Sequence, residues 1–90
     1  MSPDHAEERP RQPAVTVRYW AGARAAAGVG EDVVTGSSVR EVTAAVAARR
    51  PALLPVLAVA TLLVDGVRRG LDDLVEPGAV LEVLPPFAGG

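Results

Sequence analysis

One helix-forming segment lies near the middle of the sequence and has strand-like segments on both sides. Ser38 and Glu41 have the spacing of a capping box, in which the serine hydroxyl accepts from the Glu41 N–H and the Glu41 carboxylate accepts from the Ser38 N–H. We expect the helix to span residues 39–50, with Arg49 and Arg50 at its negative end and a proline after it. Its apolar positions recur along one helical face: Val39, Val42 and Val46.

Two strand-like segments precede this helix. Residues 14–20 alternate between two kinds of side chain with the period of two that is typical of a half-buried strand. Residues 31–35 predict a second, shorter strand that pairs with the first. The alanine-rich residues 21–28 end in glycine and connect the two strands as a short helical turn or a loop.

The sequence after the helix predicts three further strands. Residues 60–64 are apolar on both faces, and the Asp65-Gly66 pair then predicts a tight turn into a short return strand that begins at Val67. Residues 79–84 form the last strand. Before these strands, residues 52–59 predict a helical turn over the core, with three leucines buried: Leu53, Leu54 and Leu57.

This order of elements favours one α+β domain, in which a mixed sheet of about five strands carries one main helix on one face. The first and last strands are the most apolar and alternating, so we expect the last strand to be central and parallel to the first. We expect the domain to span residues 14–84, after a disordered leader at 1–13 that is rich in proline and charge. Residues 85–90 are expected to form a flexible tail.

Composition excludes several functional classes. The chain has no cysteine, which excludes a disulfide scaffold, a thiolate zinc site and a cysteine nucleophile, and its single histidine, His5, lies in the polar leader, so we expect no metal site. The net charge of −2 argues against nucleic-acid binding. No apolar run is long enough to span a membrane, and the N-terminus lacks the apolar core of a signal peptide, so we expect a cytoplasmic protein. All nine basic residues are arginines, so the chain offers no lysine on which it could form lysine-linked chains of itself.

The C-terminus departs from the polar, fraying end that most domains have. Pro85 and Pro86 restrict the backbone directly after the last strand and predict a semi-rigid root that points away from the sheet. Ala88, Gly89 and Gly90 carry almost no side chain, so such a tail can enter a narrow channel. Its terminal carboxylate is ionised at neutral pH and must be activated before it can react. We therefore assign the chemistry to the backbone carboxylate of Gly90.

The free face of the predicted sheet is partly apolar, which is unusual for a one-sided sheet in a small domain. Apolar residues on such a face mark a partner surface, unless the 52–59 segment covers them. Our candidates for that surface are Leu84, Phe87 and either Leu62 or Leu63.

Several segments together resemble the MoaD/ThiS family of ubiquitin-like sulfur carriers, over residues 14–90. They are the strand segment VTVRYWAGARAAAG, the helix start SVREV, the segment LLVDGVRR and the ending EPGAVLEVLPPFAGG. The order of elements is also that of the β-grasp fold of this family. Within the family, the ending PPFAGG is most similar to the tail of the molybdopterin synthase small subunits.

The resemblance implies a carrier with no complete active site of its own, which serves as the sulfur-donating subunit of a sulfurtransferase. An E1-like adenylyltransferase would use ATP to adenylate Gly90, and a sulfur donor acting through that partner would convert it to a thiocarboxylate. The tail would then enter the large subunit of molybdopterin synthase, in an expected heterotetramer, and give its sulfur to the molybdopterin precursor. Residues 84–89 would contact these partners, with Gly89 as the slender residue before the sulfur. No cofactor is expected on this chain.

Three other hypotheses stay open. The chain could be a carrier of the same fold that serves cysteine, thiamine or another sulfur-containing metabolite, although thiamine carriers are usually shorter and lack the Pro-Pro root. It could instead be a ubiquitin-like modifier that is conjugated to protein lysines. In a third case it is a β-grasp interaction module whose Gly-Gly ending is incidental.

Overall fold

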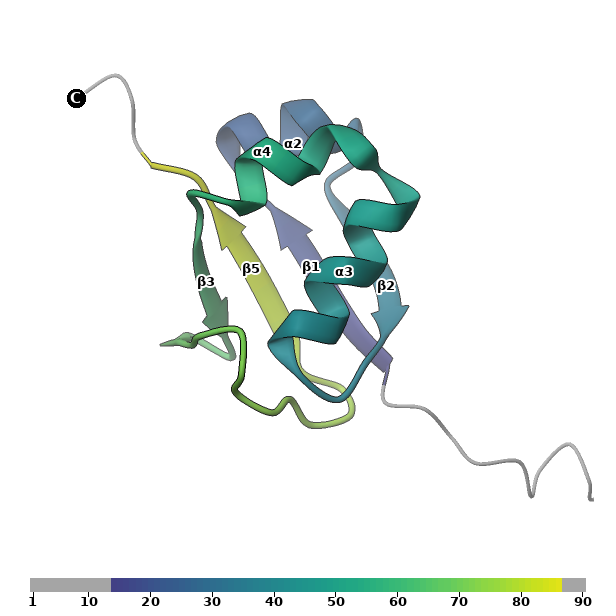
Figure 1. Cartoon of the computed structure of the whole chain (residues 1–90), viewed down its shortest axis with the longest axis vertical. Helices are drawn as coiled ribbons and strands as arrows, with labels where there is room; N and C mark the ends of the chain where they lie inside the picture. The colour runs from purple at the N-terminus through teal and green to yellow at the C-terminus, as the bar shows by residue number, and fades with distance from the viewer. Residues whose placement is uncertain (1–13, 87–90) are drawn as a thin grey trace, which may run out of the picture.

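A five-stranded mixed sheet underlies the fold, with the strand order β2-β1-β5-β3-β4 (Figure 1). The computed structural model describes residues 14–86, so the expected leader and the last four residues lie outside the described part. The elements are β1 (Ala14–Tyr19), α2 (Ala21–Ala27), β2 (Glu31–Thr35), α3 (Val39–Arg49), the 3-10 turn η1 (Pro51–Leu53), α4 (Leu54–Leu57), β3 (Thr61–Val64), β4 (Val67–Arg68) and β5 (Val80–Leu84).

The last strand is central and runs parallel to the first, which confirms the predicted topology. β5 pairs with β1 in parallel, from Thr16 opposite Val80 to Tyr19 opposite Val83. On its other side β5 pairs with β3 in antiparallel register, with Leu84 opposite Thr61. The α+β fold with a mixed sheet of five strands is therefore as predicted, and α3 is the longest helix.

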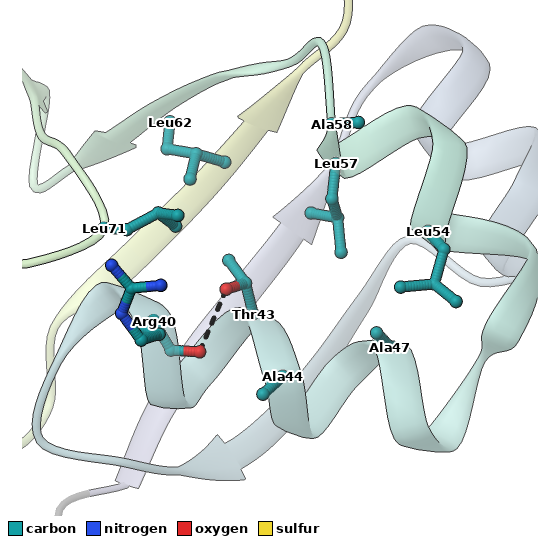
Figure 2. A pocket seen from close by; sticks show the side chains of 9 residues that line it. All are labelled: Arg40, Thr43, Ala44, Ala47, Leu54, Leu57, Ala58, Leu62 and Leu71. Atoms are coloured by element: carbon teal, nitrogen blue, oxygen red, sulfur yellow. Dashed lines mark hydrogen bonds between the residues drawn. The ribbon is translucent and has the colours of Figure 1, made fainter.

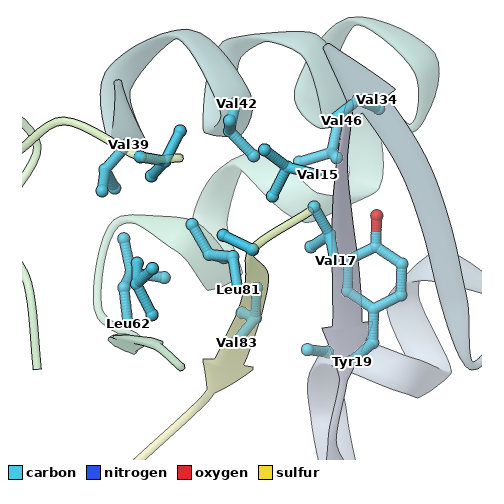
Figure 3. Close-up of a cluster of buried hydrophobic side chains, with 14 of the residues drawn as sticks. Val15, Val17, Tyr19, Val34, Val39, Val42, Val46, Leu62, Leu81 and Val83 are labelled. Carbon is cyan, nitrogen blue, oxygen red and sulfur yellow. The ribbon is translucent and has the colours of Figure 1, made fainter. Parts of the chain in front are cut away.

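The hydrophobic core lies between α3 and the sheet (Figure 3). The alternating residues of β1 and β5 that face the helix are fully buried, and the three valines predicted for the apolar face of α3 are buried against them. The buried side chains drawn in Figure 3 include Val15, Val17, Tyr19, Val39, Val42, Val46, Leu81 and Val83.

The start of α3 confirms half of the predicted capping box. The Ser38 hydroxyl accepts from the Glu41 N–H at 3.2 Å, as expected. The Glu41 carboxylate, however, accepts from the N–H of Ser37 at 2.7 Å, one residue before the predicted Ser38. The chain can pass this close beneath the first turn because residue 36 is glycine, where an added Cβ would lie 3.0 Å from Val42 Cγ2.

The segment after α3 differs from the prediction at one leucine. Leu53 is buried and Leu57 is partly buried, but Leu54 is 59% exposed. The segment is a 3-10 turn followed by a single α-helical turn, and not one continuous helix. Leu54 begins the second turn, and its side chain is left on the outer side of the domain.

Element ends differ from the predictions by one residue in most cases. Trp20 is the N-cap of α2 and not the last residue of β1. The alanine-rich connection is therefore a helix and not a loop, and its C-cap, Gly28, has the left-handed conformation. The predicted β3–β4 turn is confirmed, because Asp65 and Gly66 both have positive φ, as a tight hairpin requires. Within residues 14–86, every helix is too short to span a membrane.

Candidate functional site at the root of the tail

The chain leaves the sheet at the end of its central strand, and β5 is held on both sides up to that point (Figure 1). On one side Leu84 is paired with Thr61 of β3. On the other side the N–H of Trp20 donates to the Val83 carbonyl at 3.3 Å. The last residue pair of the β3–β5 ladder is thus also the root of the tail.

Pro85 lies against the domain, and Pro86 is exposed. A Cβ added to Gly22, in the first turn of α2, would lie 4.0 Å from Pro85 Cγ, so the proline ring is next to this turn. Two successive prolines restrict φ and the conformation of the residue before each. The direction in which the chain leaves the sheet is therefore set by Pro85 and its contact with α2.

The predicted site residues divide into two groups. Leu84, Pro85 and Pro86 come together at one end of the sheet, where β1 and β5 both end. Phe87, Ala88, Gly89 and Gly90 lie outside the described residues, so the assignment of chemistry to Gly90 stays a prediction. Among residues 14–86, acidic and histidine side chains do not gather into a cluster that could hold a metal ion.

An apolar patch lies beside the root, on the sheet face that points away from α3. Of the two leucines proposed for this surface, Leu62 is buried at 8% exposure, whereas Leu63 is half-buried and lies opposite Glu82, on the face that Leu84 shares. Trp20 lies on the same face, since its indole N–H donates to the Glu82 carboxylate at 3.3 Å, and it is 43% exposed. We call Trp20, Leu63 and Leu84 the root patch.

Trp20 was not among the predicted partner residues, although the alternation of side chains in its strand segment could have identified it. The alternation in residues 14–20 places Trp20 on the face opposite Tyr19, which is the face of Leu84. A hollow of about 350 Å³ lies next to it and is lined in part by Arg18 and Arg24. The root patch is therefore apolar, with the Glu82 carboxylate beside its three residues and the Arg18–Glu31 pair and Arg24 at its border.

A buried carboxylate ties the helices to the sheet beside the C-terminal half of β1, on the face that α3 covers, and sequence reasoning missed it. Asp32 of β2 is 6% exposed and accepts from the Tyr19 hydroxyl at 2.7 Å. Arg50 donates to both carboxylate oxygens, at 2.6 and 2.8 Å, and Arg49 donates at 3.2 Å. Arg50 also donates to the Ala27 carbonyl at 3.1 Å, which connects α2 to the same cluster.

These contacts shift the ionisation of both buried groups. The hydrogen bonds from Arg50 hold the pKa of Asp32 well below its usual range, against the opposing effect of burial. Burial raises the pKa of Tyr19 well above its usual value, and the hydrogen bond to Asp32 raises it further. Asp32 is thus a fixed anion and Tyr19 a neutral donor at neutral pH. Since the cluster is buried on the face of the sheet that α3 covers, opposite to the face of the root patch, we interpret it as structural.

The ThiS family model matches residues 17–90. No curated protein matches the sequence. Among solved structures, the small archaeal modifier protein 1 from Methanosarcina acetivorans is 25% identical with a TM-score of 0.80, and the match covers 90% of this chain and 100% of that one.

Two other solved structures are named for molybdopterin. The putative molybdopterin converting factor subunit 1 from Pyrococcus furiosus is 26% identical, with a TM-score of 0.75 over 82% of this chain and 98% of that one. A complex of subunits 1 and 2 of the molybdopterin-converting factor from Helicobacter pylori shares the fold, at 20% identity and a TM-score of 0.66 over 86% of this chain and 99% of that one. Because the family model covers the domain and the tail together, this chain belongs to the ThiS family, among the MoaD/ThiS-like ubiquitin-like sulfur carriers.

Proposed function

We propose that the chain carries sulfur as a thiocarboxylate on Gly90 and donates it in molybdopterin synthesis. The observation that supports this most is the way the chain ends. The central strand β5 is paired on both sides up to Leu84 and is followed at once by two prolines. The last four residues thus follow a strand that is paired on both sides, and the match to the ThiS family extends through them to Gly90.

The chemistry would take place on the backbone and use no side chain of this chain. A carboxylate oxygen of Gly90 attacks the α-phosphate of ATP in an E1-like adenylyltransferase, and pyrophosphate leaves. The terminal sulfur of a persulfide donor then attacks the acyl carbon and AMP leaves. A thiol cleaves the resulting acyl disulfide, which leaves the thiocarboxylate on Gly90 and a disulfide on the donor side. Because this activation consumes ATP, we expect it to take place in the cytoplasm.

The root patch suits a partner that receives the tail. Its three apolar residues lie beside the point where the tail leaves the sheet, so an enzyme that takes up residues 87–90 would also cover Trp20, Leu63 and Leu84. The Helicobacter pylori protein with this fold is found with subunit 2 of its own converting factor. By analogy we propose a large synthase subunit as the acceptor, in a heterotetramer, and the E1-like enzyme as a second partner of the same patch.

Intact-mass measurement tests the carrier chemistry directly. The full chain is incubated with ATP, an E1-like adenylyltransferase and a persulfide donor, and the expected product is heavier by the difference between one sulfur and one oxygen. A variant with one alanine added after Gly90 moves the carboxylate out of position and should gain no sulfur. The matched control has one alanine added at the N-terminus and should react like the wild type. If the two variants gain sulfur equally, the assignment to Gly90 is wrong.

The acceptor is tested separately with the thiocarboxylated chain. Sulfur transfer to the pterin precursor in the presence of the large synthase subunit would support the molybdopterin assignment. If the chain is thiocarboxylated normally but delivers its sulfur only to a cysteine-forming enzyme, it is still a sulfur carrier. The molybdopterin assignment would then be wrong, and the chain would serve another pathway.

A second candidate function is protein modification, because one of the similar structures is a small archaeal modifier protein. In that case, Gly90 would form an amide with a lysine of another protein. Mass spectrometry of cell extracts would then find the C-terminal Gly-Gly attached to lysine side chains, and deletion of Gly89 and Gly90 would remove these adducts. Their absence under conditions in which the thiocarboxylate forms would refute this function.

A further inference from the structure

A second surface of the domain has the features of a binding groove, and it lies on the helix side of the sheet (Figure 2). A hollow of about 320 Å³ lies between α3, α4 and the loop after β4. The small side chains of Ala44 and Ala47 on α3 leave room that Leu54 and Leu57 of α4 do not fill. An adjoining hollow of about 470 Å³ shares Leu57 and Leu62 with the first, so the two form one groove.

The walls of this groove are held in place by backbone hydrogen bonds. The N–H of Arg40, in the first turn of α3, donates to the Leu71 carbonyl at 2.9 Å, which fixes the loop after β4 against the helix. The N–H of Arg69 donates to the Leu62 carbonyl at 2.9 Å, which fixes the outer wall against β3. The apolar surface is thus formed before any partner arrives, and Leu54 and Leu71 are left 59% and 43% exposed on it.

Positive charge that has no ion-pair partner among residues 14–86 lies at one of the two ends of the groove. Arg40, at one end, is paired with the Asp72 carboxylate at 2.7 Å. Arg68 and Arg69 line the other end, and among residues 14–86 their side chains form no ion pair. The nearby Asp73 carboxylate instead accepts from the backbone N–H of Gly70 at 2.7 Å. An apolar floor with two cations at one end is complementary to a segment that carries large apolar side chains followed by carboxylates.

We propose that this groove binds a short acidic and apolar segment of a partner protein. The apolar side chains of the segment occupy the hollow between α3 and α4, and its carboxylates pair with Arg68 and Arg69. The hollow between α3 and α4 lies on the opposite side of the sheet from the root patch, so the apolar part of the segment does not cover Trp20, Leu63 or Leu84. Arg68 lies opposite Leu63 in the β3–β4 ladder, so the acidic end of the segment reaches the edge of that patch. This proposal depends only on the domain and does not rest on the chemistry of Gly90.

Peptide selection on the full chain tests this proposal without a known partner. Phage that display random twelve-residue peptides are selected on the wild-type chain, and we expect enriched sequences to contain Leu, Ile or Phe near Asp or Glu. Selected peptides should bind a variant with Arg68→Glu and Arg69→Glu at least about tenfold more weakly. Their affinity for the wild type should also fall as salt rises, since the ion pairs are exposed.

A matched pair of helix substitutions locates the binding site. Ala44→Phe fills the hollow from the exposed side of α3, and it should reduce peptide affinity by at least about tenfold. Ala48 lies on the same helix, is exposed and does not line the groove, so Ala48→Phe should leave the affinity unchanged. Both variants alter exposed positions, and circular dichroism confirms that they are folded.

Four results would overturn the proposal. One is the enrichment of peptides that lack acidic residues, and another is equal affinity for the Ala44→Phe and Ala48→Phe variants. The third is a dimer of the wild-type chain that Ala44→Phe abolishes, because the groove would then belong to a second copy of this protein. Failure to enrich any sequence would also count against a peptide-binding groove, and none of these outcomes affects the sulfur-carrier proposal.

Discussion

Replacing Asp32 by asparagine removes the charge at the centre of the buried cluster and nearly preserves the shape of the side chain. The asparagine has one acceptor oxygen where the carboxylate has two, so its NH2 group must face donors from Tyr19 or Arg50 that now lack an acceptor. Removal of one partner of a fully buried ion pair costs about 3–5 kcal/mol. Arg50 retains 26% exposure and water can solvate part of its charge, so we expect a loss of about 2–3 kcal/mol.

The pH dependence of this loss identifies its cause. The pKa of Asp32 is lower in the folded state than in the unfolded chain, where it is about 3.9. Its contribution to the free energy of unfolding is therefore fully present above that value and is lost as the pH falls towards the folded pKa. The difference in stability between the wild type and the Asp32→Asn variant should thus be constant from pH 6 to 7 and should shrink below about pH 4.

Urea denaturation followed by far-ultraviolet circular dichroism measures both effects. The matched control is Glu31→Gln on the same strand, because Glu31 is half-exposed and its nearest contact with Arg18 is 3.6 Å. We expect this control to change the free energy of unfolding by less than about 0.5 kcal/mol. A loss below about 1 kcal/mol for Asp32→Asn, or a loss that is the same at pH 3 and pH 7, would refute the assignment of a structural ion pair.

Three further substitutions test local features of the fold and of the root patch. Gly36→Ala should destabilise the domain by about 1 kcal/mol or more, as measured by urea denaturation, because the added Cβ meets Val42 at 3.0 Å. Ser38→Ala removes the acceptor for the Glu41 N–H and should cost about 1 kcal/mol in the same assay; an unchanged midpoint would mean that the cap contributes nothing. Leu63→Arg places a cation opposite the Glu82 carboxylate, so it should change the free energy of unfolding by less than about 1 kcal/mol and weaken binding to the proposed E1-like partner at least about tenfold, as measured by calorimetry. Unaltered binding would remove Leu63 from the partner surface.

Local patterns were sufficient to predict most of the elements. The alternation in residues 14–20, the Ser38 cap and the Asp65-Gly66 turn each depend on neighbours in the sequence, and the structure has a strand, a helix start and a hairpin at these places. The central position of the last strand also followed from its apolar alternation. These features could be predicted because burial on one face leaves a regular trace in the sequence.

The Asp32 cluster could not be predicted in the same way. Arg49 and Arg50 were assigned to the negative end of the α3 dipole, but both donate to a carboxylate that lies 17 and 18 residues earlier in the chain. Asp32 occupies an inward position of a strand, where periodicity alone predicts an apolar residue. Only the packing of α3 across β2 brings these groups together. The predicted burial of Leu54 was wrong for a related reason. The change from a 3-10 turn to an α-helical turn, which leaves this side chain exposed, has no clear sequence signal.

The position of β5 also determines how the domain responds when its C-terminus is pulled. A partner that draws the tail into a channel exerts force along the strand axis, and β5 is bonded along its length to β1 on one side and to β3 on the other. The force therefore loads both ladders in shear, so their hydrogen bonds share it and do not open one after another. Because β1 is parallel to β5, the chain enters and leaves the sheet at opposite ends, and a pull between these ends meets this resistance directly (Figure 1). We expect the domain to act as a mechanical clamp that keeps its fold while the tail is inserted and withdrawn.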